Sequence, residues 1–210
     1  MYLIVGLGNP GSEYHKTRHN VGFEALDCLI EAYAFPRPQI KHRAMISKGY
    51  IDGVPVLAAK PLTYMNCSGE AVRAICDYFK IDPETELIVL CDDIYLQVGS
   101  LRIRKQGSDG GHKGLKDIIR HLGTERFIRM RIGVGDAEDH ENLANHVLGH
   151  FSKEDRVTVD DVLAQAAKAA ALAVTDGIDA SMNLYNKTVK KQKTGQKTDV
   201  PDQQKESEAS

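Results

Sequence analysis

The sequence predicts an α/β protein, a single three-layer α/β/α domain with a twisted, mixed, mostly parallel central sheet. Two observations favour this class. Short apolar runs that are typical of buried strands alternate along the chain with segments in which apolar residues recur at helical spacing. A hairpin pattern and two late segments of alternating polarity break that order, which indicates a mixed rather than a purely parallel sheet.

The first half of the chain opens with a strand, a helix and a hairpin. Residues 2–7 are an apolar run typical of a buried strand, and apolar residues recur at helical spacing over residues 21–33. Residues 44–51 and 54–59 flank Asp52-Gly53, a dipeptide typical of tight hairpin turns.

Residues 87–91 are a continuous apolar run, which we expect to form a central strand buried on both faces. The run ends at Asp92-Asp93. A helix is predicted before it, because apolar side chains return every three or four residues. Those side chains are Ala71, Val72, Ile75, Cys76 and Phe79.

Two later segments, residues 100–104 and 128–134, alternate apolar residues with arginines. Because successive side chains of a strand point to opposite faces, this alternation predicts two strands with the apolar residues inward and the arginines outward. The outward arginines are Arg102, Arg104, Arg129 and Arg131.

Helices complete the predicted domain, which spans residues 1–186. A short helix contains Leu115 and Leu122 and ends at Gly123, and two more are expected at about 155–175 and 178–186. Residues 187–210 are polar and charged with almost nothing apolar, which predicts a disordered tail.

Composition narrows the class of protein. No apolar run approaches the roughly 18 residues of a membrane span, and we expect neither a secretory signal nor a membrane contact, so the expected location is cytoplasmic. The four cysteines lack CxxC spacing and lie in apolar segments, as free thiols of a cytosolic protein do. A metal site is therefore not expected.

The charge is unevenly distributed. The chain as a whole has a net charge of −2, but the segment 102–131 contains nine Lys or Arg and three Asp or Glu. The clustering of Arg102, Arg104, Arg129 and Arg131 with lysines of this segment favours contacts with a phosphate backbone over a merely solvated face.

The loop after the first strand contains Gly6-Leu7-Gly8-Asn9-Pro10-Gly11, which matches the dinucleotide fingerprint GxGxxG. The context argues against that interpretation, because Pro10 removes one of the amides that would meet a pyrophosphate and a long polar loop delays the helix. Glu31 lies within a helix instead of ending a second strand. We expect the glycines to turn the backbone.

Three polar residues of the loops are expected to converge. Asn9 follows the first strand and Asp92 ends the central strand, and ligands of open α/β sheets bind at that edge. His19 precedes the first helix. A carboxylate that accepts a hydrogen bond from one imidazole nitrogen leaves the other basic, so His19 and Asp92 predict a base that activates water.

Two further segments stand before predicted helices. Asn66 is either a helix N-cap or a fixed amide that binds substrate or water, and both roles are compatible. The segment Gly110-Gly111-His112-Lys113-Gly114 is either a glycine-rich hinge or a set of exposed amides suited to an anion or a carbonyl oxygen.

Taken together, several separated blocks resemble the bacterial-type peptidyl-tRNA hydrolase family from Leu3 to about Asn186. Any one block is weak evidence for the family, but all of the blocks in this order are a specific signal. The blocks are Gly6–Gly11 with Glu13-Tyr14, Thr17–Asn20, Pro61–Gly69, Asp92-Asp93, Gly110–Gly114 and Arg129–Gly133.

The resemblance implies a monomeric enzyme, without cofactor or metal, that hydrolyses the ester between a peptide and the 3′ ribose of tRNA and so recycles tRNA. It implies that His19 is the catalytic base, that Asp92 orients it and that Asn9 positions substrate and water. Other residues match positions that contact the substrate or the tRNA. The substrate positions are Tyr14, Tyr64, Met65, Asn66, Gly111 and Lys113, and the tRNA positions are Arg102, Arg104, Lys105 and Arg131.

The sequence departs from the family at two positions. Lys113 stands where the family typically has an Asn that contacts the peptide, and Tyr95 replaces a common acidic residue. Lys113 leaves open a second hypothesis, an RNA-binding protein on the same scaffold without catalysis. The intact set of Asn9, His19, Asn66 and Asp92 argues against it.

Overall fold

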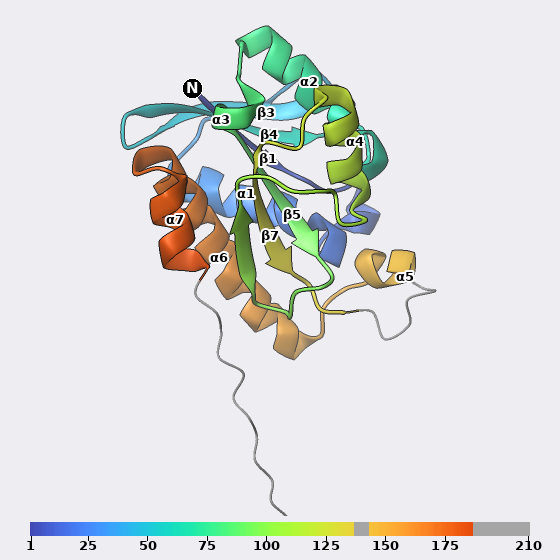
Figure 1. Ribbon diagram of the computed structural model, residues 1–210. Coiled ribbons are helices and arrows are strands. Elements are labelled where there is room, and N and C mark those ends of the chain that lie inside the picture. The colour runs from blue at the N-terminus through green and yellow to red at the C-terminus, as the bar shows by residue number, and fades with distance from the viewer. Residues whose placement is uncertain (137–142, 187–210) are drawn as a thin grey trace, which may run out of the picture.

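The structure, a computed structural model, describes residues 1–136 and 143–186. These residues form a seven-stranded sheet in the order β2-β3-β4-β1-β5-β7-β6, with helices on both faces (Figure 1). The predicted class, a three-layer α/β domain with a mixed sheet, is confirmed. The predicted tail, residues 187–210, lies outside the described residues.

The centre of the sheet is parallel and its two sides are antiparallel. β1 pairs with β4 and with β5, and β5 pairs with β7, all in parallel. The β2–β3, β3–β4 and β6–β7 pairs are antiparallel. The strands are β1 (Tyr2–Gly6), β2 (Gln39–Lys41), β3 (Ala44–Ile51), β4 (Val54–Pro61), β5 (Leu87–Asp93), β6 (Leu101–Arg104) and β7 (Ile128–Gly133).

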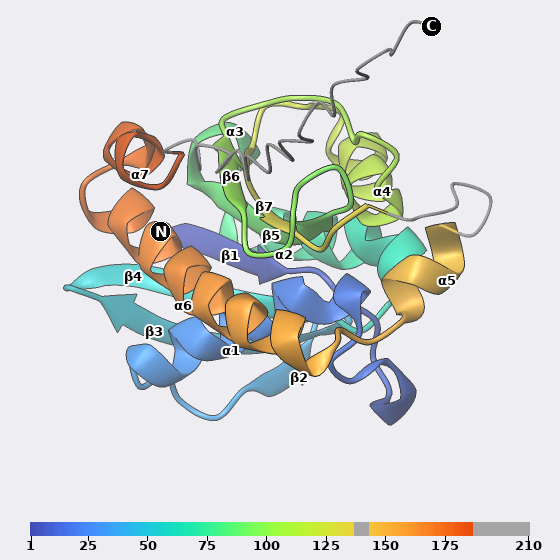
Figure 2. The ribbon, with the colours of Figure 1, turned by 90° about the horizontal axis from the view of Figure 1, so that it is seen from below.

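Two separate apolar cores flank the sheet. On one face α1, α6 and α7 pack over side chains such as Ile4, Leu90 and Met130. On the other face α2 and α4 pack over side chains such as Val5 and Val89 (Figure 2). The helices are α1 (Val21–Ala32), α2 (Ser68–Phe79), α4 (Lys113–Leu122), α6 (Lys153–Thr175) and α7 (Ile178–Tyr185).

Several short elements have no counterpart in the predicted set. They are β2, the one-turn helix α3 (Pro83–Glu86), the helix α5 (Leu143–Leu148) and the 3₁₀ turns η1 (Ser12–Tyr14), η2 (Arg18–Asn20) and η3 (Met65–Cys67). Segments of this length are too short to show a period in the sequence. Four of them, η1, η2, η3 and α5, contribute side chains to the functional site.

The turn residues behave as their chemistry predicts at the hairpin and at the end of α4. Asp52 and Gly53 have φ angles of 46° and 83°, the left-handed pair that a two-residue hairpin requires. Gly123 ends α4 with a φ of 72°.

Gly6 and Gly22 allow a close approach of β1 and α1, which corrects the expectation that the first glycines only turn the backbone. A Cβ at Gly6 would lie 2.3 Å from the carbonyl oxygen of Gly22, and a Cβ at Gly22 would lie 2.4 Å from that of Leu90. Of the glycines Gly6, Gly8 and Gly11, only Gly11 has a positive φ, 118°. The contact fixes the start of α1 against the ends of β1 and β5.

Arg129 does not face solvent, so its predicted outward orientation is wrong. Its side chain is 1% exposed and stacks on Phe127, with the guanidinium carbon 4.2 Å from the ring centroid. The guanidinium donates to the carbonyl oxygens of Gly107, Ser108 and Glu125. The loop between β6 and α4 covers this part of the sheet, and Arg129 holds that loop in place.

The residue that follows α7 makes hydrogen bonds with the free edge of the outer strand β6. The backbone N–H of Ile103 donates to Oδ1 of Asn186 at 2.7 Å, and Nδ2 of Asn186 donates to the carbonyl oxygen of Ile103 at 3.0 Å. The side-chain amide therefore pairs with the strand as a neighbouring backbone would.

Two further sequence expectations concern membranes and cysteines. No helix within residues 1–136 and 143–186 is long and apolar enough to cross a membrane. The four cysteines are free thiols, with Cys76 and Cys91 buried and Cys28 and Cys67 partly buried.

Candidate active site

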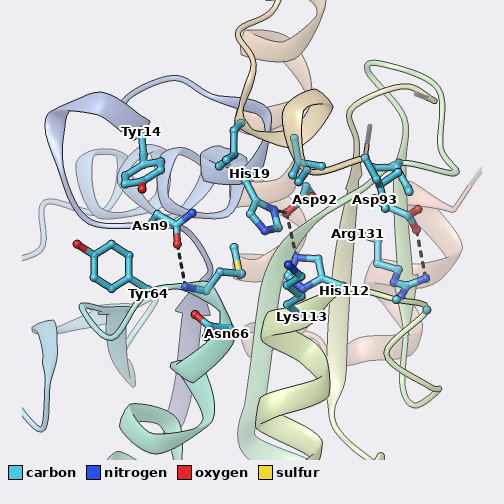
Figure 3. Close-up of a pocket in the computed structure, with 18 of the residues that line it drawn as sticks. Asn9, Tyr14, His19, Tyr64, Asn66, Asp92, Asp93, His112, Lys113 and Arg131 are labelled. Carbon is cyan, nitrogen blue, oxygen red and sulfur yellow. Dashed lines mark hydrogen bonds and ion pairs between the residues drawn. The ribbon is translucent and has the colours of Figure 1, made fainter. Parts of the chain in front are cut away.

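A cavity of about 840 Å³ opens at the carboxyl ends of β1, β5 and β7. Most of the polar residues predicted for the site line it (Figure 3). Because β4 continues the sheet on one side of β1 and β5 on the other, the cavity lies at the switch point where ligands of open sheets bind. The predicted residues that line it are Asn9, Tyr14, His19, Tyr64, Met65, Asn66, Asp92, Gly111, Lys113 and Arg131.

His19 and Asp92 make the contact that the sequence predicts. His19 lies in η2, directly before α1, and Asp92 is the sixth residue of β5. Nδ1 of His19 lies 2.8 Å from Oδ1 of Asp92, and the two residues are 9% and 3% exposed. We assign the proton to Nδ1, because an ionised carboxylate only accepts hydrogen bonds. Nε2 is then left with a free lone pair.

His112 is a second partner of Asp92, and sequence reasoning missed it. Its Nε2 lies 2.9 Å from the same Oδ1, and the two imidazole rings are 5.2 Å apart (Figure 3). His112 is the N-cap of α4, with Nδ1 accepting from the amides of Gly114 and Leu115 at 3.1 and 3.2 Å. The position of a polar side chain before a predicted helix was the available signal.

The two imidazoles determine the ionisation of Asp92. Burial raises the pKa of its carboxyl group, but the hydrogen bonds from His19 and His112, and the positive charge that each imidazole carries when protonated, lower it more. The net pKa lies well below the usual range of an aspartate. Asp92 is therefore a carboxylate at neutral pH and able to stabilise an imidazolium.

Asn9 is fixed from both of its ends. Its backbone N–H donates to Oδ1 of Asn20 at 2.8 Å, and Nδ2 of Asn20 donates to its carbonyl oxygen at 3.0 Å. Its side-chain Oδ1 accepts from the backbone N–H of Met65 at 2.8 Å. Nothing in the described part of the chain accepts from Nδ2 of Asn9, which leaves this amide as a donor for a ligand. Asn20 is a second residue that the sequence did not single out.

Asn66 is not an N-cap, so that one of its two predicted roles is wrong. It lies within η3, and the N-cap of α2 is Cys67, which makes no side-chain cap bond. Asn66 is exposed and lines the cavity. Its amide is thus available to a ligand.

Two tyrosines stand at one end of the cavity. The rings of Tyr14 and Tyr64 are 6.3 Å apart and nearly perpendicular, and Tyr64 is 51% exposed. Tyr64 has a φ of 57° and a ψ of 163°, a combination that costs a non-glycine residue about 1–3 kcal/mol. This backbone conformation precedes the amide of Met65 that binds Asn9.

Most amides at the start of α4 already have acceptors within the chain, so the prediction of exposed amides is wrong for Gly111, His112 and Gly114. The N–H of Gly111 donates to Oδ1 of Asp109 at 2.7 Å, and the N–H of His112 donates to the carbonyl oxygen of Asp109 at 3.1 Å. The amides of Gly114 and Leu115 donate to the His112 ring. Lys113 is exposed on the rim of the cavity.

Asp93 and Arg131 form an ion pair beside the site. Nη1 of Arg131 lies 3.2 Å from Oδ2 of Asp93, and Nη2 donates to the carbonyl oxygen of Asp109 at 3.0 Å. Oδ1 of Asp93 accepts from the amide of Tyr95, which forms the turn after β5. Arg131 is one-fifth exposed, so it faces the cavity more than bulk solvent.

The other predicted tRNA positions lie on the outside. Arg102, Arg104 and Lys105 are exposed, and Lys105 pairs with Asp179 at 2.7 Å. In the β6–β7 register Arg102 stands opposite Arg131, and Arg104 opposite the buried Arg129. Positive charge is thus concentrated on one face of this strand pair.

An apolar wall closes the other side of the cavity. It is supplied by Ile94 after β5 and by side chains of α5. Arg18 ties α5 to η2, because its backbone N–H donates to Gly149 and its guanidinium to the carbonyl oxygen of His150. The α5 residues in the wall are Leu143, Ala144, Val147 and Leu148.

His19, Asp92 and His112 are also the kind of group that a metal ion binds, with ligand atoms within 4.8 Å of one another. Hydrogen bonds already use both nitrogens of His112 and the Nδ1 atom of His19. A metal would have to replace these bonds, so the expectation of a metal-free site stays a prediction.

The chain is similar to known proteins over most of its length. A family model described as peptidyl-tRNA hydrolase matches residues 3–194. The peptidyl-tRNA hydrolase of Agathobacter rectalis is 48% identical over 186 residues, which are 89% of this chain and 100% of that protein. That of Lachnoclostridium phytofermentans is 48% identical over 187 residues, 89% of this chain and 97% of that protein.

A solved structure gives the same result for the fold. The crystal structure of peptidyl-tRNA hydrolase from Acinetobacter baumannii superposes with a TM-score of 0.84 at 34% sequence identity. The match covers 89% of this chain and 95% of that one.

Proposed function

This chain belongs to the peptidyl-tRNA hydrolase family and is a hydrolase of peptidyl-tRNA, and from this premise we propose that His19 activates the water that cleaves the ester. The bond broken joins the peptide to the 3′ ribose of the tRNA. The observation that carries the proposal is the buried hydrogen bond from Nδ1 of His19 to Asp92, which leaves Nε2 facing the cavity as a base.

The reaction balances without a further reactant. Nε2 of His19 takes a proton from water, and the hydroxide forms a bond to the ester carbonyl carbon. The carbon–oxygen bond to the ribose then breaks, and the imidazolium returns its proton to the ribose oxygen. Asp92 stabilises the imidazolium during this step, as the carboxylate of a hydrolase triad does. The products are a free tRNA 3′ end and a peptide carboxylic acid, which releases its proton to solvent and becomes a carboxylate.

Two side-chain amides are placed to stabilise the negative charge on the carbonyl oxygen. Nδ2 of Asn9 is fixed by the bond of the same side chain to Met65, and Asn66 lines the cavity nearby. In many enzymes, preorganised donors of this kind make the largest single contribution to the rate enhancement. Because the amides of Gly111 and His112 are already bound to Asp109, they are not included.

The positions of the residues around the cavity support one orientation of the bound substrate. Tyr14 and Tyr64 lie on the opposite side of His19 from Asp93 and Arg131 (Figure 3). Nucleobases stack on aromatic rings, so the tyrosines are proposed to bind the tRNA 3′ end. Met65, Gly111 and Lys113 are proposed to contact the peptide or its ester.

The tRNA body is proposed to lie across β6. Arg102, Arg104 and Lys105 are exposed there, and Arg131 joins them at the cavity. Contacts of Arg and Lys with phosphates hold a nucleic acid without reading its sequence. We further propose that the enzyme acts as a monomer in the cytoplasm, without a cofactor or a metal.

A turnover assay tests the role of His19. With enzyme far below substrate, wild type is expected to hydrolyse N-blocked aminoacyl-tRNA over many cycles, and His19→Ala to lose about 10²–10⁴ in kcat, the usual contribution of a general base. His15→Ala is the matched control, because His15 is an exposed histidine of the same loop.

The outcomes separate the hypotheses. A His19→Ala enzyme as fast as wild type would show that the base is wrongly assigned. A wild-type protein that binds tRNA but releases at most one product per molecule would instead support an RNA-binding protein without catalysis.

A further inference from the structure

We propose that His112 is a positioning residue, which holds the Asp92 carboxylate in the orientation that His19 needs and connects it to the N-terminus of α4. The inference rests on the proposed role of His19 as the base. It assigns a task to a residue that does not carry out the chemistry itself.

The hydrogen bonds of His112 define its tautomer. Nδ1 accepts from two backbone amides, those of Gly114 and Leu115, so it carries no proton. The proton therefore lies on Nε2, which donates to Oδ1 of Asp92. His112 is thus a neutral donor held at both ends, and both its nitrogens are used.

Oδ1 of Asp92 consequently accepts two hydrogen bonds. His19 and His112 approach Oδ1 of Asp92 from different elements, the turn before α1 and the start of α4. With a single donor the carboxylate could rotate about its Cβ–Cγ bond and still keep that hydrogen bond. With two donors in fixed positions this rotation breaks one of them, so the His19 ring is also held in place.

The hydrogen bond from His112 also reduces the negative charge of Asp92 that acts on His19. A hydrogen bond from His112 draws part of the carboxylate charge toward α4, whose N-terminus is the positive end of the helix dipole. The titratable groups that face Asp92 are His19 and His112, while Arg131 on the neighbouring strand pairs with Asp93. Removal of the His112 N–H strengthens the attraction between Asp92 and a protonated His19.

His112→Asn separates this role from helix capping. Oδ1 of asparagine, like Nδ1 of histidine, is attached to Cγ, and Asn is among the best N-caps, so the amides of α4 keep an acceptor. The asparagine side chain ends there and cannot reach Asp92. His112→Ala removes both contacts, and His121→Asn, which changes an imidazole on the same helix bound to Asp117, is the control.

We expect His112→Asn to melt within about 2 °C of wild type, because the cap is retained. Its kcat on peptidyl-tRNA is expected to fall on the order of tenfold with KM unchanged, as for other residues that orient a reacting group. The acidic limb of its pH–kcat profile is expected to move to higher pH by about half a unit, a moderate change of a charge–charge contact. His121→Asn is expected to retain both values.

The alternatives give different results. A His112→Asn enzyme with wild-type kcat and an unmoved or lowered pH midpoint would overturn the proposal, as would a loss of activity that follows a fall in melting temperature. A wild-type chain that does not turn over peptidyl-tRNA would instead refute the proposed function.

Discussion

The carboxylate of Asp92 makes the stability of the fold depend on acidic pH. Its pKa lies well below the usual range of an aspartate, so below about pH 4 the unfolded chain binds a proton that the folded chain does not. The stabilisation is complete above pH 4 and is lost as the pH falls toward the folded pKa. The loss is at most about 1.4 kcal/mol per pH unit.

Urea unfolding of wild type and Asp92→Asn at pH 6, 4, 3 and 2 measures this contribution. We expect the free energy of unfolding of wild type to fall more steeply than that of the variant below pH 4. Asp27→Asn is a suitable control, because Asp27 is a mostly exposed carboxylate on α1. Parallel curves for wild type and Asp92→Asn would contradict the assignment.

Single residues also show which contacts of the site can be predicted from the sequence. The contact of His19 with Asp92 followed from their positions after β1 and β5, because parallel strands end at one edge of a sheet. The contact of His112 with Asp92 could not be predicted in this way. Histidine is an uncommon N-cap, and only the tertiary structure brings its Nε2 to Asp92. Arg129 was misplaced because strand alternation does not reveal a loop that covers the outer face.

At the level of elements, the contact between α1 and the sheet positions the catalytic loop. Gly22→Ala would place a Cβ 2.4 Å from the carbonyl oxygen of Leu90, which forces α1 away from β1 and β5. We expect a loss of stability of about 1–3 kcal/mol, the usual cost of overpacking, and a fall in kcat because η2 moves with α1.

Chemical denaturation and turnover on peptidyl-tRNA measure the two effects. Glu31→Ala, at an exposed position of the same helix, is expected to change neither. If Gly22→Ala retained wild-type stability and kcat, the helix would not depend on this close approach.

Most of the regular elements could be predicted, and most of the short ones could not. The predicted helix at 21–33 is observed as Val21–Ala32, and the predicted hairpin strands 44–51 and 54–59 as Ala44–Ile51 and Val54–Pro61. The helix α5 has only six residues, too few for an apolar period to stand out. Its contribution to the cavity wall arises from the tertiary position that Arg18 gives it.

For the whole molecule, the uneven charge predicts how tRNA affinity responds to salt. The chain is slightly acidic overall, so binding through phosphates depends on the basic face of β6 and β7. Arg102→Ala and Arg104→Ala are each expected to weaken tRNA binding and to lower the slope of log affinity against log salt by about 0.8, the value for one phosphate contact.

A salt titration of tRNA binding by wild type and both variants checks this. Arg37→Ala removes an exposed arginine between α1 and β2, outside the proposed interface, and is expected to keep the wild-type slope. Equal slopes for all four proteins would place the tRNA on a different surface.

The pairing of Asn186 with Ile103 has a consequence for how molecules of this chain meet one another. An uncovered outer strand is a template to which a second chain can add, and each added strand renews the template. Here one side-chain amide occupies the two backbone groups of Ile103 that an incoming strand would need. The Asn186 side chain therefore blocks the addition of a second chain to β6 at Ile103, and this position does not seed strand-to-strand aggregation.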